Sequence, residues 1–221
     1  MTLSKATNKI HAVLFDLDGT LVDTAPDLVA ALNLSLNDHG FQSVELSAVR
    51  EAASNGSLAL VKAAVGQSSD EQQYSIQQGL LNHYQVVNGQ FSRLFDGVSE
   101  FLSHLDDLNI PYGVVTNKPA RFTRPLMHAL ALTDRVKTVI SGDSTQFSKP
   151  HVAPMLLAAQ QINCHPEKIL YLGDAERDLI AAQNSAMHGG IALWGYIGPN
   201  DSPNDWPHSY SYTHPKMIIL E

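Results

Sequence analysis

Residues 12–24, AVLFDLDGTLVDT, place two aspartates two positions apart directly after an apolar run. The apolar residues 10–15 predict a buried strand, because a turn signal follows them at once. Aspartate is disfavoured in strands, and two ionised carboxylates so close together repel each other. Asp16 and Asp18 therefore indicate a site at the end of this strand, where something positively charged offsets their charge.

A divalent cation is the simplest source of that positive charge. Side chains two positions apart on an extended chain point the same way, so Asp16 and Asp18 can face one bound group. Oxygen-only ligands suit Mg²⁺, and Asp174 can supply a third carboxylate from the end of a later strand. Gly19 allows the tight turn that follows the two aspartates. We therefore expect Mg²⁺ at Asp16, Asp18 and Asp174.

The second half of the chain alternates between strand-like and helix-like segments. Alternation of strands with helices of roughly 10 to 15 residues predicts right-handed crossovers and a parallel sheet. The fold class expected is α/β, with a doubly wound parallel sheet. The expected strands are 111–117, 137–143, 168–174 and 190–194, and the expected helices are 98–109, 119–132, 152–162 and 176–186.

A helical segment separates the first strand from this alternation. Residues 25–90 carry apolar side chains at helical spacing, and no strand candidate interrupts them. We expect residues 1–21 and 94–221 to form an α/β core domain, and residues 22–93 to form an inserted all-helical cap domain.

The ends of the predicted strands carry polar side chains that could perform phosphoryl transfer. Ligands of open parallel sheets bind outside the carboxyl ends of the strands. Asp16 is ionised at neutral pH and could attack phosphorus, while Asp18 could protonate the leaving alkoxide and later activate water. Thr116 and Lys149 could neutralise the transferring group. Taken singly, each has an ordinary explanation: Asp174 as a helix N-cap, Thr116 and Asn117 as a turn, Lys149 as a solvated lysine.

Four motifs together resemble those of the haloacid dehalogenase superfamily in order and type: DLDGT at 16–20, VVTN at 114–117, SKP at 148–150 and GDAERD at 173–178. The resemblance covers the whole chain. It implies a doubly wound core, a helical cap inserted after the first motif, and Mg²⁺-dependent hydrolysis of phosphate esters through an aspartyl phosphate. By position it implies Asp16 as nucleophile, Asp18 as acid/base whose backbone carbonyl also reaches the metal, Thr116, Asn117 and Lys149 as phosphate-binding residues, Asp174 as metal ligand, and Asp178 as its outer-shell acidic supporter.

Within the superfamily the chain is most similar to phosphoglycolate phosphatases with an all-helical cap. Three segments, at 116–127, 54–66 and 195–206, further resemble bacterial N-acetylmuramic acid 6-phosphate phosphatases. The resemblance implies a small phosphorylated metabolite as substrate, either 2-phosphoglycolate or N-acetylmuramic acid 6-phosphate. One departure is Val152, where the lysine motif usually has a second proline.

The segment 54–57, Ser-Asn-Gly-Ser, lies between two predicted helices of the cap. It resembles the substrate-specificity loop of capped relatives, so Asn55 and Gly56 are candidates for recognition of the leaving group. A helix C-cap followed by an N-cap explains the same residues equally well.

Composition excludes several classes of partner. The formal net charge of −8 gives no basic footprint for nucleic acid, and the apolar runs are too short to cross a bilayer. The N-terminal segment lacks the apolar stretch of a secretory signal, and Cys164 has no second cysteine to pair with. We expect a cytoplasmic protein that is a monomer or homodimer and binds neither nucleic acid nor membranes.

Three other functions are compatible with parts of this pattern. A haloacid dehalogenase has no alkoxide to protonate, so it does not need Asp18. A sugar-phosphate mutase similar to β-phosphoglucomutase retains all four motifs and differs in what its cap binds. A phospho-accepting receiver module has no cap, so the insertion at 22–93 disfavours it.

Overall fold

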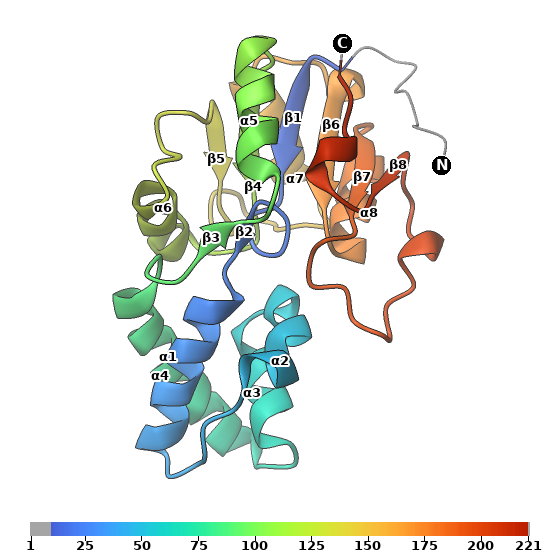
Figure 1. The fold of residues 1–221 in the computed structure, drawn as a ribbon. Coiled ribbons are helices and arrows are strands. Elements are labelled where there is room, and N and C mark those ends of the chain that lie inside the picture. The colour runs from blue at the N-terminus through green and yellow to red at the C-terminus, as the bar shows by residue number, and fades with distance from the viewer. Residues whose placement is uncertain (1–9, 221) are drawn as a thin grey trace.

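The computed structural model describes residues 10–220 (Figure 1). The expectation about a secretory signal falls on residues 1–9 and therefore lies outside the described residues. Within them, no helix is long and apolar enough to cross a membrane.

A six-stranded sheet forms the centre of the molecule, with strand order β5-β4-β1-β6-β7-β8. Every neighbouring pair is parallel, which confirms the α/β prediction. The chain winds outward from β1 in both directions, first through β4 and β5 and then through β6 to β8. The strands are β1 (Ala12–Phe15), β4 (Tyr112–Val115), β5 (Thr138–Ile140), β6 (Ile169–Gly173), β7 (His188–Ala192) and β8 (Tyr210–Tyr212).

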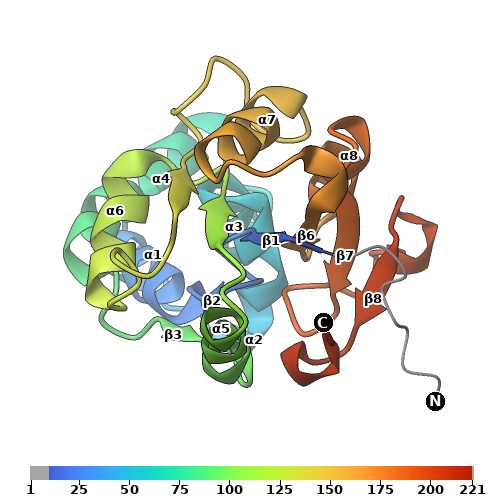
Figure 2. The same ribbon diagram turned by 90° about the horizontal axis from the view of Figure 1, so that it is seen from above.

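Helices cover both faces of this sheet (Figure 2). Val13 and Phe15 of β1 pack with α5 (Val98–Asp107) and α6 (Ala120–Ala129). Ala12 and Leu14 point to the opposite face and pack with α7 (Val152–Gln161) and α8 (Glu176–Asn184). The strand is buried along its whole length because each of its two faces has its own layer of helices.

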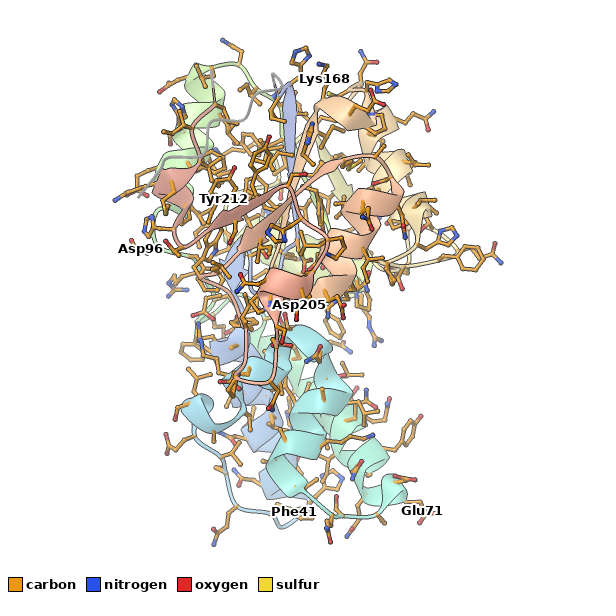
Figure 3. All side chains as sticks on the ribbon, turned by 90° about the vertical axis from the view of Figure 1, so that its right-hand side faces the viewer. Phe41, Glu71, Asp96, Lys168, Asp205 and Tyr212 are labelled. Carbon is orange, nitrogen blue, oxygen red and sulfur yellow. The ribbon has the colours of Figure 1, made fainter. Side chains whose placement is uncertain are left out.

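The helical insertion is α1 (Ala25–Asp38), α2 (Leu46–Val49), a 3₁₀ turn η1 (Arg50–Asn55), α3 (Ser57–Val65) and α4 (Asp70–Val87). It lies beyond the carboxyl ends of the strands, as Figure 1 shows. In Figure 3, Phe41 and Glu71 mark its far end, and Lys168 marks the opposite end of the molecule. Its helices share an apolar cluster that includes Leu32, Leu36 and Leu80.

The two ends of the insertion are tied together. β2 (Val22–Asp23) pairs antiparallel with β3 (Arg93–Leu94). Asp27 in the first turn of α1 is fully buried and accepts hydrogen bonds from the N–H groups of Gly89 and Phe91, at 2.7 Å each. These contacts bring the start of α1 next to the chain segment that follows α4.

The structure differs from the expected elements in four places. Between α1 and α3, the expected helical pattern forms only the short α2 and the 3₁₀ turn Arg50–Asn55. The strands β2, β3 and β8 were not predicted. Each is two or three residues long, too short for a period of two to be visible in the sequence.

Candidate active site

A tight loop follows β1 and shapes the site. The N–H of Gly19 donates to the carbonyl of Val22 at 3.0 Å, and the N–H of Val22 donates to the carbonyl of Leu17 at 2.9 Å. Gly19 has φ +85°, a conformation that favours glycine, so the expected tight turn is confirmed. A Cβ atom at Gly19 would lie 2.1 Å from Oδ2 of Asp174, so this glycine also allows the loop to approach the end of β6.

Three buried carboxylates meet where β1 and β6 end. Asp16, Asp174 and Asp178 each offer an oxygen, and these oxygens lie within 4.8 Å of one another. Within residues 10–220 this is the one group of acidic, histidine or cysteine side chains close enough together to hold a metal ion. The group contains Asp178 in place of Asp18, whose carboxylate points to a different partner.

Hydrogen bonds fix the orientation of Asp174. Its Oδ1 accepts from the hydroxyl of Thr20 at 3.1 Å. Its Oδ2 accepts from the hydroxyl of Ser54 and from the main-chain N–H of Tyr196, both at 2.9 Å. Since Ser54 belongs to the helical insertion, the insertion directly contacts a carboxylate of the acidic cluster.

Lys149 is the cation of the cluster. Its Nζ lies 2.9 Å from Oδ1 of Asp16 and 2.7 Å from Oδ1 of Asp178, and it donates to the hydroxyl of Tyr171 at 2.8 Å. The ammonium thus pairs with two carboxylates and one hydroxyl group. Oδ2 of Asp178 accepts from the N–H of Ala175 at 3.1 Å, so both oxygens of Asp178 are engaged within the protein.

Burial is the main cause of the shifted carboxylate pKa values in the cluster. Burial raises the pKa of Asp16 to about 6; Lys149 opposes this rise and Asp178 adds to it. Burial, together with the charges of Asp16 and Asp178, raises the pKa of Asp174 to about 7. Burial acts to lower the pKa of Lys149, but the two carboxylates that it contacts outweigh burial and raise it.

This donor set fits Mg²⁺. All candidate ligands are carboxylate oxygens, and one ammonium cannot balance three carboxylates. Oδ1 of Asp16 contacts Lys149 and accepts from the N–H of Leu17 at 2.7 Å. Asp16 and Asp174 would hold the ion, with Asp178 supporting Lys149.

Asp18 has its own cation. Its Oδ1 lies 2.7 Å from Nζ of Lys118 and 2.5 Å from the hydroxyl of Thr24. The Lys118 side chain is 7% exposed, and its Nζ sits 4.7 Å from the ring centroid of Tyr84. Lys118 was not among the predicted site residues, although its position directly after the motif VVTN at 114–117 was a usable signal.

Thr116 and Asn117 follow β4 and line the same pocket as Asp16. Thr116 is buried, and its hydroxyl accepts from the N–H of Lys118 at 3.1 Å. The amide of Asn117 donates to the carbonyl of Lys149 at 3.0 Å and accepts from its N–H at 2.9 Å. The Asn117 side chain therefore fixes the main chain of the lysine loop.

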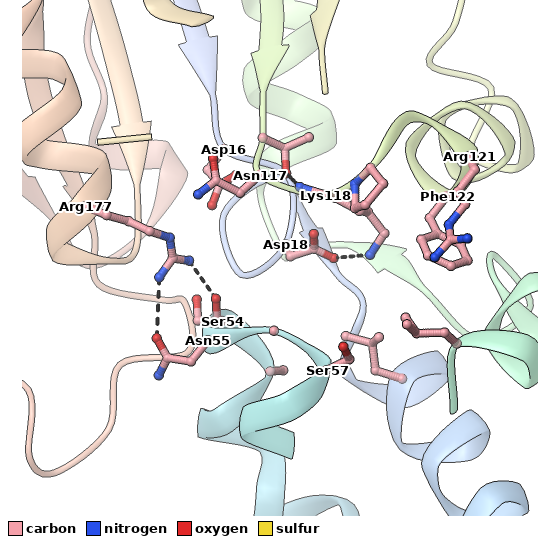
Figure 4. Close-up of a pocket in the computed structure, with 16 residues that line it drawn as sticks. Asp16, Asp18, Ser54, Asn55, Ser57, Asn117, Lys118, Arg121, Phe122 and Arg177 are labelled. Atoms are coloured by element: carbon pink, nitrogen blue, oxygen red, sulfur yellow. Dashed lines mark hydrogen bonds and ion pairs between the residues drawn. The ribbon is translucent and has the colours of Figure 1, made fainter. Parts of the chain in front are cut away.

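The pocket has a volume of about 430 Å³ and lies between the ends of the strands and the helical insertion (Figure 4). Asp16 and Asp18 contribute to it from the β1 loop, and Leu28 and Leu81 from the insertion. The remaining lining residues are Ala53, Ser54, Asn55, Gly56, Ser57, Thr116, Asn117, Lys118, Pro119, Arg121, Phe122 and Arg177. Both predicted residues of the insertion, Asn55 and Gly56, are therefore at the pocket.

Arg177 joins the two walls of this pocket. It belongs to the motif at 173–178, and its guanidinium donates to the carbonyl of Ser54 at 2.6 Å and to Oδ1 of Asn55 at 3.4 Å (Figure 4). The predicted site residues include the two aspartates of that motif but not the arginine. The prediction also overlooked Tyr171 and Tyr196, which have no local signal and contact the site only through the fold.

The parallel sheet carries a buried acidic cluster and one lysine at the carboxyl ends of its strands, and a helical insertion covers the pocket. This combination defines a class of enzyme that acts on small anionic ligands. Residues 13–190 match the family of haloacid dehalogenase-like hydrolases. The chain belongs to this family, so the resemblance seen in the four motifs is confirmed.

Relatives and solved structures agree with this assignment. The chain is 36% identical to an N-acetylmuramic acid 6-phosphate phosphatase of Pseudomonas aeruginosa over 96% of its length and 94% of the relative's. It is 36% identical to a phosphoglycolate phosphatase of Xanthomonas campestris, covering 94% of each chain. A crystal structure described as a predicted phosphoglycolate phosphatase from Haemophilus somnus superposes with a TM-score of 0.81 at 25% identity, covering 95% of this chain and 96% of the other. The expectation of a hydrolytic enzyme of the phosphatase type is confirmed.

Proposed function

We propose that the protein is a Mg²⁺-dependent phosphomonoester hydrolase that acts through an aspartyl phosphate formed on Asp16. The observation that carries this proposal is the position of Asp16 and the contacts of its carboxylate group. This side chain is buried at the pocket, and Lys149 contacts its Oδ1. A carboxylate held at one oxygen presents the other to an incoming phosphorus atom.

The first chemical step is assigned to residues at three strand ends. Asp16 attacks phosphorus, and the ester oxygen leaves. Lys149 and the hydroxyl of Thr116 stabilise the charge that develops on the transferring phosphoryl group. Mg²⁺ held by Asp16 and Asp174 would supply further positive charge to the phosphoryl oxygens. The backbone carbonyl of Asp18 would be an additional ligand of the ion.

Asp18 is the proposed general acid and base. Lys118 and Thr24 both donate to its Oδ1, so the proton for the leaving alkoxide would be carried on Oδ2. After the alcohol departs, the same oxygen takes a proton from the water that hydrolyses the aspartyl phosphate. Lys118 and Thr24 act in this scheme by fixing the orientation of the carboxylate.

Residues 22–93 are proposed to be a cap domain that recognises the leaving group. Its pocket residues Ser54, Asn55 and Gly56 face the acidic cluster from the opposite side. The names of the relatives suggest 2-phosphoglycolate or N-acetylmuramic acid 6-phosphate as substrate. We further propose that the protein is cytoplasmic and is a monomer or a homodimer.

Release of inorganic phosphate from these two esters in the presence of Mg²⁺ tests the proposal. We expect turnover by the unmodified protein, loss of turnover with a chelator, and loss in Asp16→Asn. Asp107→Asn on the exposed side of α5 is the matched control and should retain full activity. Hydrolysis by Asp16→Asn at the unmodified rate would refute Asp16 as nucleophile. Conversion of a sugar phosphate to an isomer without release would instead indicate a mutase.

A further inference from the structure

Arg121 is a cation of the pocket wall that is exposed to solvent and forms no ion pair within residues 10–220. It lies in the first turn of α6 and lines the pocket. Within residues 10–220, no carboxylate lies within ion-pair distance of its guanidinium, and the guanidinium donates no hydrogen bond there. The other two cations of the pocket are engaged: Lys118 pairs with Asp18, and Arg177 binds the 54–55 segment.

An aromatic side chain holds the guanidinium of Arg121 in place. Its Cζ lies 4.6 Å from the ring centroid of Phe122. Phe122 is buried and packs edge-on against Tyr84, with ring centroids 5.2 Å apart. Stacking on a fixed ring leaves the N–H edges of a guanidinium available to a planar anion such as a carboxylate. In Figure 4, Arg121 lies beside Phe122 at one end of the pocket, and Asp16 lies toward the other.

The wall around Arg121 is not suited to the phosphate itself. Asp16, the proposed nucleophile, lines the pocket, and Lys149 contacts it from the buried side. Leu28, Leu81 and Phe122 add apolar surface on the side of the insertion. The volume of about 430 Å³ is in the range that accommodates a drug-sized ligand, and it exceeds what a two-carbon acid needs.

We infer that Arg121 binds a carboxylate on the leaving group of the substrate. This inference rests on the proposed phosphatase function. It makes Arg121 a specificity-determining residue, because the guanidinium contacts the leaving group at a distance from the reacting phosphorus.

Matched pairs of substrates test this inference. N-acetylmuramic acid 6-phosphate differs from N-acetylglucosamine 6-phosphate by one lactyl ether that carries the carboxylate. 2-Phosphoglycolate and 2-hydroxyethyl phosphate form a second pair. For at least one pair, we expect the unmodified enzyme to prefer the carboxylate ester by about 10-fold to 100-fold in kcat/KM, the range of a charge-assisted bidentate contact.

Arg121→Gln should reduce that preference to near unity, mainly through KM for the carboxylate ester. Arg121→Lys should retain part of it, because the charge remains without the planar fork. Arg124→Gln is the matched control: Arg124 is exposed on the same helix and does not line the pocket, so the preference should stay unchanged. Circular dichroism and Tm establish that each variant is folded.

The outcomes separate this inference from the proposed function. If the unmodified enzyme releases phosphate but shows no preference in either pair, or if Arg121→Gln keeps the preference, the assignment of Arg121 is wrong and the phosphatase function stands. If the unmodified enzyme hydrolyses none of the four esters with Mg²⁺, the proposed function fails, and the inference fails with it.

Discussion

The main-chain N–H of Tyr196 donates to Oδ2 of Asp174 at 2.9 Å, so a residue far along the chain orients a carboxylate of the acidic cluster. The hydroxyl of the same tyrosine accepts from the N–H groups of Thr24 and Ala25, at 2.7 and 2.8 Å, and donates to Oδ1 of Asp23 at 2.7 Å. Tyr196 thus connects the acidic cluster to the start of α1, where the helical insertion begins.

Replacement of Tyr196 by phenylalanine removes the hydroxyl and retains the main-chain N–H. We expect the free energy of unfolding to fall by about 1 to 3 kcal/mol, because two buried N–H donors at the start of α1 lose their acceptor. Tyr74→Phe is the control, since Tyr74 is 63% exposed and should change stability by much less. Urea denaturation measures both values, and equal losses in the two variants would refute the capping role of Tyr196.

Gly19→Ala should abolish Mg²⁺-dependent turnover. Alanine is strained at the φ of +85°, and its Cβ would meet Oδ2 of Asp174 at 2.1 Å, so this carboxylate has to move. A displacement of about 1 Å costs on the order of 100-fold in rate. Gly40→Ala has the same kind of strain, with φ +76° and nothing within 4 Å of the added Cβ, so it should lose stability and retain activity. Phosphate release and Mg²⁺ titration compare the variants; unchanged Mg²⁺ affinity in Gly19→Ala would contradict the prediction.

Lys149→Met should lower both stability and activity. It leaves Asp16 and Asp178 buried without their cation, a change that typically costs about 3 to 5 kcal/mol. It also removes a charge that lowers the pKa of Asp16, so this pKa should rise and a larger fraction of the nucleophile should be protonated at neutral pH. Lys62→Met, at an exposed position of α3, is the control.

Chemical denaturation and phosphate release measure the two effects of Lys149→Met. Lys149→Arg separates charge from geometry: it should recover part of the stability and little of the activity, because a guanidinium does not fit three partners placed around one nitrogen. Stability of Lys149→Met equal to that of Lys62→Met would show that the buried ion pairs contribute nothing.

Stability should depend on pH in opposite ways with and without Mg²⁺. The pKa of Asp16 rises from 3.8 to about 6, and that of Asp174 from 3.8 to about 7. Between about pH 4 and pH 7 the metal-free folded state therefore binds more protons than the unfolded state. The free energy of unfolding should fall as the pH rises through this range. The loss should be at most about 7 kcal/mol, because each unit of pKa shift corresponds to about 1.4 kcal/mol.

Mg²⁺ binds the deprotonated carboxylates, so its stabilising effect should grow over the same pH range. Thermal unfolding with Mg²⁺ or with a chelator, at a series of pH values, measures both trends. Asp174→Asn should flatten the metal-free trend and remove the response to Mg²⁺. A metal-free protein that gains stability from pH 4 to 7 would refute the raised pKa values.

Local sequence patterns were sufficient for five of the six strands of the sheet and for the position of the site. The strand at residues 10–15, its two aspartates and the alternation after residue 97 are short-range signals, because side-chain periodicity and turn residues act over a few positions. Since strands of a parallel sheet share one carboxyl edge, these signals also placed Asp16, Thr116, Lys149 and Asp174 in one region.

The pairing of charges within that region could not be predicted. Sequence indicated that Asp16 and Asp18 face one ion, whereas in the structure they have separate cations, Lys149 and Lys118. The choice depends on how the loop at Gly19 turns and on which side chains the neighbouring strands bring beside it. These contacts join residues that are a hundred or more positions apart, so short-range sequence patterns do not reveal them.

Strand and turn propensities are local, so the order of residues is enough to predict the reactive side chains and the strands that they follow. Tyr171, Tyr196 and Arg177 join the site, Asp178 supports Lys149, and Arg121 lines the pocket without a counter-ion only because of the folded arrangement. Those contacts arise because segments that are distant in the sequence pack together. The energy of each buried charge then depends on the charged and polar groups that packing places beside it.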